Sequence, residues 1–149
     1  MSTPFGALSR EWDHLSLGLA LTGDLLPVVS NPNALISPDS KMQGLGKTPS
    51  RYNRNHKVAG IAGWTQHVAT QEEVAAWSKD PDYGICIQTR TVRAIDIDVE
   101  DVDVVQDIVE EIGGQLHWLG LPMRTRPNSS KCLLLFQYTG ELPKRILRL

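Results

Sequence analysis

Two aspartates, Asp96 and Asp98, stand two positions apart in the apolar stretch 94–99. Side chains alternate between the two faces of a strand, so residues i and i+2 point the same way, about 7 Å apart. An ionised carboxylate in such a strand needs a compensating charge, which a divalent cation supplies. The pair therefore predicts a catalytic metal site in which Asp96 and Asp98 hold Mg²⁺ or Mn²⁺ for phosphoryl transfer. The alternative is that the strand ends near Asp96 and that both acids are hydrated or cap the next helix.

A basic segment rich in hydroxyl groups, residues 124–131, leads directly into the apolar run 132–138. Arginine binds phosphate oxygens as a fork, lysine acts as a point charge, and loop amides add donors. We therefore expect a nucleoside triphosphate to bind at Arg126, Ser129, Ser130 and Lys131. A solvated turn that happens to be basic is the alternative interpretation.

A third segment, residues 46–57, interleaves basic side chains with one aromatic ring. Such a pattern can follow a nucleic-acid backbone or close over a nucleotide. The candidate nucleic-acid-binding residues are Lys47, Arg51, Arg54 and Lys57. The stretch is not a P-loop, because Lys41 occupies the position of the first glycine.

The composition favours one folded domain over residues 1–149. The chain has 149 residues, of which 41% are hydrophobic and 21% charged, enough for a core in a domain of ordinary length. Residues 71–111 carry twelve acidic and three basic side chains, while the rest of the chain has five acidic and twelve basic ones. An acidic centre between basic segments suits a metal site that faces a polyanion. Ordinary solvated surface charge is the alternative.

No stretch approaches the roughly 20 consecutive apolar residues of a membrane span, and the first residues lack the basic and apolar parts of a secretory signal. Cys86 and Cys132 each lie in an apolar run, which favours buried thiols in a reducing compartment over a disulfide. We therefore expect a cytoplasmic protein with no membrane partner.

Hydrophobic periodicity divides the first half of the chain into short elements. It predicts a helix over 10–21, a strand over 25–29 with Pro27 at a sheet edge, and a functional loop over 30–55. Thr70 and Glu73 have the spacing of a capping box, so a helix is expected to begin there and to end near Trp77.

The second half predicts a hairpin, a helix and a final strand. The hairpin joins 83–87 to 92–99 through residues 88–91. The helix begins at Asp101 or Asp103 and ends at Ile112, where two glycines follow. The strand covers 132–138. The expected fold class is α+β, with a mostly antiparallel sheet that carries the site on one face and has helices behind it.

The order of these motifs resembles the N-terminal domain of bifunctional DNA primase–polymerases, in the archaeo-eukaryotic primase superfamily of phages, prophages and plasmids. The likeness covers roughly residues 20–145. In chain order the matching motifs are Lys47-x-Pro49, Gly63-Trp64, a helix opened by Ala69-Thr70, Pro81-x-x-Gly84-Ile85 and Ile95-Asp96-Ile97-Asp98-Val99.

This resemblance implies an RRM-like catalytic core that transfers nucleotidyl groups from NTPs or dNTPs along a DNA template during phage or plasmid replication. It implies two divalent cations, Mg²⁺ or Mn²⁺, on the pair Asp96 and Asp98. It also implies a triphosphate at Ser129, Ser130 and Lys131 with Arg126 nearby, replication partners such as a helicase, and a bacterial host cytoplasm.

Two departures from the family pattern qualify these implications. Many relatives carry histidine where this chain has Lys131, although some phage-type members have lysine. The family also has a third carboxylate on a later strand, and no matching residue precedes Leu149. We therefore expect either a fragment of a longer primase–polymerase or a shortened product that is inactive alone.

Two other functions fit the same residues. A non-catalytic primase-like module would bind DNA or a protein partner, for example as a phage-encoded inhibitor. Another D-x-D phosphotransfer enzyme, such as a toprim-type nucleotidyltransferase or a nucleotide-sugar transferase, would use the aspartates differently. The toprim type requires a glutamate on an earlier strand, and the preceding strands offer none.

Overall fold

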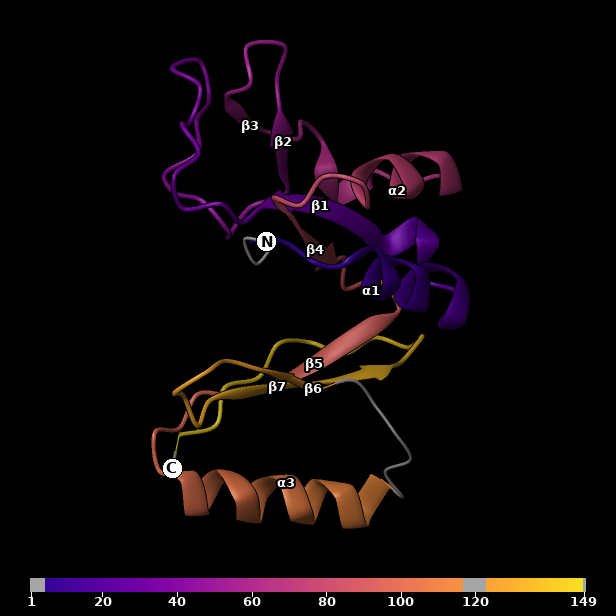
Figure 1. Cartoon of the computed structure of the whole chain (residues 1–149). Helices are drawn as coiled ribbons and strands as arrows, with labels where there is room; N and C mark the ends of the chain where they lie inside the picture. The colour runs from indigo at the N-terminus through magenta and orange to yellow at the C-terminus, as the bar shows by residue number, and fades with distance from the viewer. Residues whose placement is uncertain (1–4, 117–122, 149) are drawn as a thin grey trace. The chain divides into compact units, whose positions relative to one another are not determined.

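The computed structural model describes residues 5–116 and 123–148. It confirms the predicted α+β class, with short antiparallel strands and a few helices. The chain divides into two compact units, Met1–Gln88 and Thr89–Leu149, and each is described by itself (Figure 1). The expectation of a single domain stays a prediction.

The first unit contains most of the short elements. In chain order they are α1 (Ser9–Asp13) with a π-helical turn (His14–Gly18), a 3₁₀ turn (Thr22–Asp24), β1 (Leu25–Val29), β2 (Ser50–Tyr52), β3 (Val58–Gly60), a second 3₁₀ turn (Trp64–Gln66), α2 (Gln71–Trp77) and β4 (Tyr83–Ile87). The strand predicted over 25–29 is confirmed by β1. The helix predicted over 10–21 is confirmed as far as Gly18, where the helical turns end, and is wrong over 19–21.

Two antiparallel pairs, β1–β4 and β2–β3, form the small sheets of this unit. β1 is apolar along almost its whole length and is buried, and α2 packs on it. The rings of Trp12 and Trp77 meet at 6.4 Å between centroids. The buried apolar residues of the unit include Trp12, Leu25, Leu26, Val29, Val58 and Val74.

The start of α2 follows the predicted capping box. Thr70 Oγ1 accepts a hydrogen bond from the backbone N–H of Glu73 at 3.2 Å. In return, the Glu73 carboxylate accepts one from the backbone N–H of Thr70 at 3.0 Å. Two N–H groups that the first helical turn leaves without partners are thereby satisfied.

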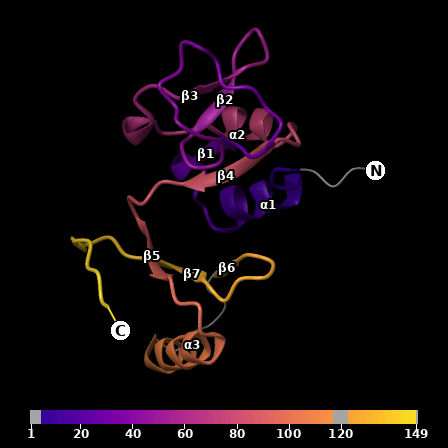
Figure 2. The same ribbon diagram turned by 90° about the vertical axis from the view of Figure 1, so that its left-hand side faces the viewer.

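The long segment between β1 and β2 is a loop that is attached to the rest of the unit near both ends. Ile36 forms a parallel bridge with Val58, and Ser37 N–H donates to the Val58 carbonyl at 2.8 Å. Near the other end, Gly46 N–H donates to the Val29 carbonyl at 3.1 Å. Figure 2 shows the loop arching beside the β2–β3 hairpin.

The second unit is a three-stranded antiparallel sheet with one helix. Its elements are β5 (Val92–Ile97), α3 (Val102–Leu116), β6 (Met123–Thr125) and β7 (Cys132–Gln137), in the sheet order β5-β7-β6. α3 lies along one face of this sheet (Figure 1). Its core contains Ile97, Val105, Cys132 and Leu134, with Ile95, Val99, Ile108, Val109 and Ile112 packed against them.

The predicted hairpin between 83–87 and 92–99 is wrong. β4 pairs with β1, and β5 pairs with β7, so the two strands belong to different sheets. Backbone N–H of Gln88 donates to the Asp24 carbonyl at 2.8 Å, which holds the end of β4 in the first unit. Short apolar strands look alike in sequence, and long-range burial decides which of them pair.

Two further boundaries differ from the expectation. α3 continues through Gly113 and Gly114 to Leu116, because a glycine inside a helix costs only about 1 kcal/mol. Part of the segment expected as a basic loop forms β6. Among the residues that the structure describes, no helix is long and apolar enough to cross a membrane. Cys86 and Cys132 are free thiols.

Candidate functional site

Asp96, on strand β5, and Asp98, just past its end at Ile97, lie on the face of the sheet that α3 does not cover. The alternate residues Ile95, Ile97 and Val99 pack toward α3, whereas both aspartates are exposed. Alternation along a half-buried strand thus separates an apolar face from a charged one. The two carboxylates share one side of the sheet, as their spacing predicts.

The register of the sheet sets Lys131 opposite Asp98. Ile97 pairs with Cys132 in an antiparallel register, so Asp98, which follows Ile97, faces Lys131, which precedes Cys132. Lys131 Nζ lies 2.8 Å from Asp98 Oδ1 and 3.8 Å from Glu100 Oε1. The expected phosphate-binding lysine and one expected metal ligand therefore form an ion pair.

Strand β6 brings two arginines to the same face. Arg124 pairs with Leu133, which itself pairs with Asp96 across β7. Arg126 follows Thr125 at the end of β6 and lies beside the row of Asp98 and Lys131, close enough for its charge to act on both. The charged face thus carries Asp96, Asp98 and, beside Lys131, Glu100, together with three cations from the neighbouring strands and their ends.

The ion pair shifts the titration of both partners. The hydrogen bond from Lys131 and its positive charge lower the pKa of Asp98, and the Arg126 charge adds to this effect, while burial acts in the opposite direction. The same hydrogen bond and the charge of Asp98 raise the pKa of Lys131 above its usual value. Both groups are therefore charged at neutral pH, so Asp98 is ready to bind a cation and Lys131 an anion.

The two serines of the β6–β7 turn have different environments. Ser130 Oγ donates to the carbonyls of Val99 and Glu100, at 2.7 and 2.9 Å, and ties the turn to the exit of β5. Its single hydroxyl hydrogen is thus shared between backbone acceptors. Ser129 Oγ accepts from the backbone N–H of Lys131 at 3.3 Å and is exposed, so its own hydrogen can turn toward solvent. Of the two, Ser129 is better placed to donate to a phosphate.

Asp96 and Asp98 fit a cation such as Mg²⁺ that takes its other ligands from the phosphates of a substrate. Carboxylate oxygens are the ligands that Mg²⁺ and Mn²⁺ prefer, and Mg²⁺ is often held by only one or two protein carboxylates plus phosphate oxygens. Over residues 5–116 and 123–148 there is no group of three or more His, Cys, Asp or Glu side chains that could hold a metal ion. Asp96 and Asp98 therefore fit a metal–phosphate complex better than a bare ion.

The residues expected to bind nucleic acid belong to the other unit. Arg51 lies on β2, Arg54 and Lys57 on the turn that joins β2 to β3, and Lys47 on the long loop before β2. All but Lys57 are exposed. Of the four, Lys47 lines an open hollow, together with Lys41 and Trp64, and the other three do not line it. Sequence reasoning counted Lys41 among the basic residues but did not place it in a site, because its loop has no periodicity.

Comparisons with protein-family models, with curated proteins and with solved structures find no match to this chain.

Proposed function

We propose that this chain carries the catalytic metal-binding and triphosphate-binding residues of a DNA primase–polymerase. It would transfer nucleotidyl groups from NTPs or dNTPs with Mg²⁺ or Mn²⁺ in phage or plasmid replication. The observation that supports this most is the 2.8 Å contact between Lys131 Nζ and Asp98 Oδ1. It brings the predicted metal ligands and the predicted triphosphate ligands, 33 positions apart in the chain, onto one face of one sheet.

The chain's own residues would act by position and charge. Asp96 and Asp98 hold the cation, which when bound neutralises phosphate charge and acts as a Lewis acid. Lys131 and Arg126 bind non-bridging phosphate oxygens, Lys131 as a point charge and Arg126 as a fork. The backbone carbonyls that accept from Ser130 keep the turn against β5, so these groups stay oriented when the substrate binds.

Lys131 changes partner in this proposal. Without substrate it neutralises Asp98. A metal–triphosphate complex brings a cation to Asp98 and an anion to Lys131, so both charges exchange an internal partner for a substrate partner. The complex should therefore bind more tightly than the free cation or the free nucleotide, since either one alone leaves a charge of the pair without a partner.

A binding experiment tests the proposal without requiring turnover. The affinity for a nucleoside triphosphate is measured by calorimetry with Mn²⁺ and with EDTA, for wild type and for Asp96→Asn with Asp98→Asn. We expect Mn²⁺ to strengthen binding in wild type at least tenfold and in the double variant hardly at all. A control with the same charge change is Asp107→Asn with Glu110→Gln, two exposed acids on α3. Equal Mn²⁺ dependence in the two double variants would refute the metal role.

The second candidate is a non-catalytic primase-like module that binds DNA or a protein partner, for example as an inhibitor. It is favoured by the lack, in the described part of the chain, of a third metal-ligating side chain beside Asp96 and Asp98. This module would bind DNA or its partner unchanged after both aspartates are replaced, and it would make no primer with any metal. Metal-dependent triphosphate binding by wild type separates the two candidates.

A further inference from the structure

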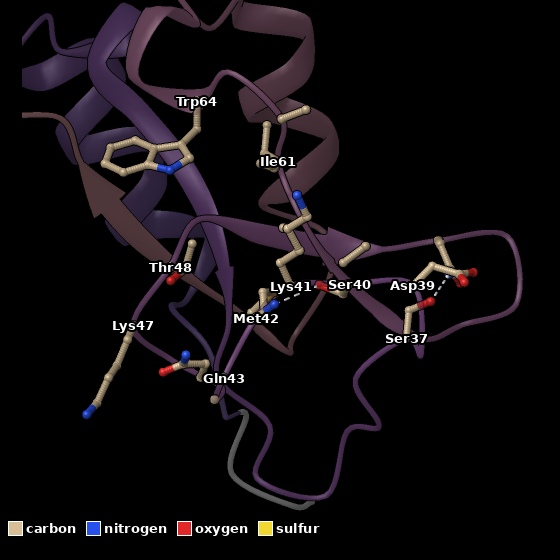
Figure 3. Close-up of a pocket in the computed structure, with 15 residues that line it drawn as sticks. Ser37, Asp39, Ser40, Lys41, Met42, Gln43, Lys47, Thr48, Ile61 and Trp64 are labelled. Atoms are coloured by element: carbon tan, nitrogen blue, oxygen red, sulfur yellow. Dashed lines mark hydrogen bonds between the residues drawn. The ribbon is translucent and has the colours of Figure 1, made fainter.

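The first unit contains an open hollow between the long loop and the β2–β3 hairpin. Its volume is about 1010 Å³, and residues of the loop (37–48) and of β3 with the chain after it (59–64) form its two walls. Figure 3 shows Lys41, Met42 and Thr48 on the loop side, with Ile61 and Trp64 across from them. The hollow lies at the upper end of the size range of ligand pockets and is wide open to solvent.

Hydrogen bonds shape the loop wall without any ligand. Asn53 Nδ2 donates to Ser37 Oγ at 3.4 Å, and Met42 N–H donates to Ser40 Oγ at 3.3 Å. Met42 also packs over Gly60, where an added Cβ would lie 3.4 Å from its Cγ. Together with the attachments of the loop near Ser37 and Gly46, these contacts fix the loop wall against the β2–β3 hairpin.

The charge around the hollow is mostly positive. Lys41 and Lys47 line it and are exposed, and among the described residues of the lining Asp39 is the one acid. Arg51 pairs with Ala59, a lining residue, but does not itself line the hollow. Two lysines against one carboxylate favour an anionic ligand.

An aromatic ring completes the lining. Gly63 has a φ of 63°, in the left-handed region, and begins the 3₁₀ turn that carries Trp64. Trp64 is half-buried and borders the hollow (Figure 3). A ring beside lysines is the combination that binds single strands, since bases stack on the ring and phosphates bind the cations. Bases already stacked inside a duplex cannot use such a ring.

We infer that this hollow binds single-stranded nucleic acid, with Lys41 and Lys47 on the phosphates and Trp64 against a base. This deepens the proposed function, since the strand would be the template, but it is carried by residues of the first unit only. The ligand class follows from an open shape, a positive rim and an aromatic wall. The two functional regions are therefore separable by mutation.

The test is fluorescence anisotropy with a labelled oligothymidylate and the full chain in EDTA, over a series of salt concentrations. Wild type should bind with a strong salt dependence. Lys41→Gln with Lys47→Gln should weaken binding, and the slope of log affinity against log salt should fall by about 0.7 for each phosphate that the variant no longer neutralises. Trp64→Leu should lose roughly five- to hundredfold in affinity, and Trp64→Phe should retain much of it.

Lys79→Gln is the control for the loss of a lysine elsewhere, because Lys79 belongs to the same unit and does not line the hollow. It should bind like wild type. The inference is overturned if wild type does not bind the oligonucleotide, if the Lys79 variant loses as much affinity as the Lys41–Lys47 variant, or if a duplex of the same length binds equally well. Unchanged oligonucleotide binding by the Asp96–Asp98 variant, with its Mn²⁺ response abolished, would support both proposals. If wild type lacks the Mn²⁺ response but binds the strand, only the proposed function fails.

Discussion

At the scale of single residues, the ion pair of Asp98 and Lys131 matters for charge rather than for stability. Their side chains are 74% and 42% exposed, and exposed ion pairs contribute little to folding free energy. What the pair does is keep both groups ionised and close together. Ser130 also acts by positioning: its hydroxyl donates to the carbonyls of Val99 and Glu100 and so holds the turn in place.

Replacing Lys131 with methionine should return the pKa of Asp98 toward its usual value. The change removes the hydrogen bond from Lys131 and its positive charge, which are the two largest causes of the lowered pKa. A lowered carboxyl pKa stabilises the folded state above the usual pKa, and this contribution is lost as the pH falls through the lowered value. NMR titration of the Asp98 carboxyl measures the shift directly. Lys144→Met, in the exposed C-terminal segment, is the control and should leave Asp98 unchanged. An unchanged titration in the Lys131 variant would contradict the ion pair.

Tyr52 forms the shortest polar contact of the first unit's aromatic cluster. Its hydroxyl donates to Asp82 Oδ2 at 2.6 Å, while its ring stacks on His56 at 4.0 Å and on Tyr83 at 5.9 Å. Burial, followed by the hydrogen bond to Asp82, raises the pKa of Tyr52 well above its usual value. Folding therefore favours the neutral phenol of Tyr52 over the phenolate.

Tyr52→Phe should destabilise the first unit by about 1–2 kcal/mol at neutral pH, because it removes a hydrogen bond to a charged group. A raised pKa gives stability below the usual tyrosine value, and that stability is lost as the pH rises through the folded-state value. The difference between wild type and variant should therefore shrink above about pH 10. Urea unfolding at neutral and alkaline pH measures it. Tyr138→Phe, which alters an exposed tyrosine, should cost almost nothing, and an equal loss there would count against the assignment.

At the scale of elements, local patterns and long-range packing carry different information. The capping box of α2 depends on four consecutive residues, Thr70 to Glu73, and it forms as predicted. The pairing of β4 with β1 joins residues about 60 positions apart, such as Leu25 and Ile87, so nothing near β4 in sequence reveals it. A helix start is a local event, whereas a strand partner is chosen by burial.

Thr70→Ala should cost about 1 kcal/mol of the first unit's stability, because the N–H of Glu73 loses its acceptor. Thermal unfolding followed by circular dichroism gives the value. Thr65→Ala replaces an exposed threonine outside the helix and should change stability by only a few tenths of a kcal/mol. Equal effects of the two changes would mean that the cap contributes nothing.

Leu134→Ala should destabilise the second unit by about 2–5 kcal/mol, because Leu134 is 1% exposed in the cluster between β7 and α3. Leu133 is the matched control, since it is the neighbouring leucine on the opposite, partly exposed face. Leu133→Ala should cost clearly less. Hydrogen exchange of α3 amides reports the second unit specifically. A larger loss from Leu133 would place the core on the wrong face of the sheet.

At the scale of the whole molecule, the two proposed binding regions lie in different units. The strand-binding hollow is built from residues 37–64, and the metal–triphosphate face from β5, β6 and β7. Charge is not divided between the units, because each unit carries one more acidic than basic side chain. It is divided locally: Lys41 and Lys47 line the hollow, and Asp98 and Glu100 lie against Lys131.

The two kinds of binding should therefore be separable. Lys41→Gln with Lys47→Gln should weaken oligothymidylate binding and leave the affinity for Mn²⁺ with triphosphate within about twofold of wild type, a few tenths of a kcal/mol. Asp96→Asn with Asp98→Asn should do the reverse. Calorimetry with each ligand on all three full-length proteins checks this. If either double variant fails to bind both ligands, the two sites are not independent.

The sequence by itself determined what depends on neighbours in the chain. Alternation put Asp96 and Asp98 on one face, the capping box placed the start of α2, and the mixture of predicted helices and strands indicated an α+β fold. Only the tertiary structure decided which strands pair and what the loop encloses. It set Lys131 on Asp98, moved β5 out of the predicted hairpin, and joined Lys41 to Trp64 around one hollow. The reason is physical: backbone periodicity and caps are local, whereas strand register and cavities follow from burying apolar surface contributed by distant segments.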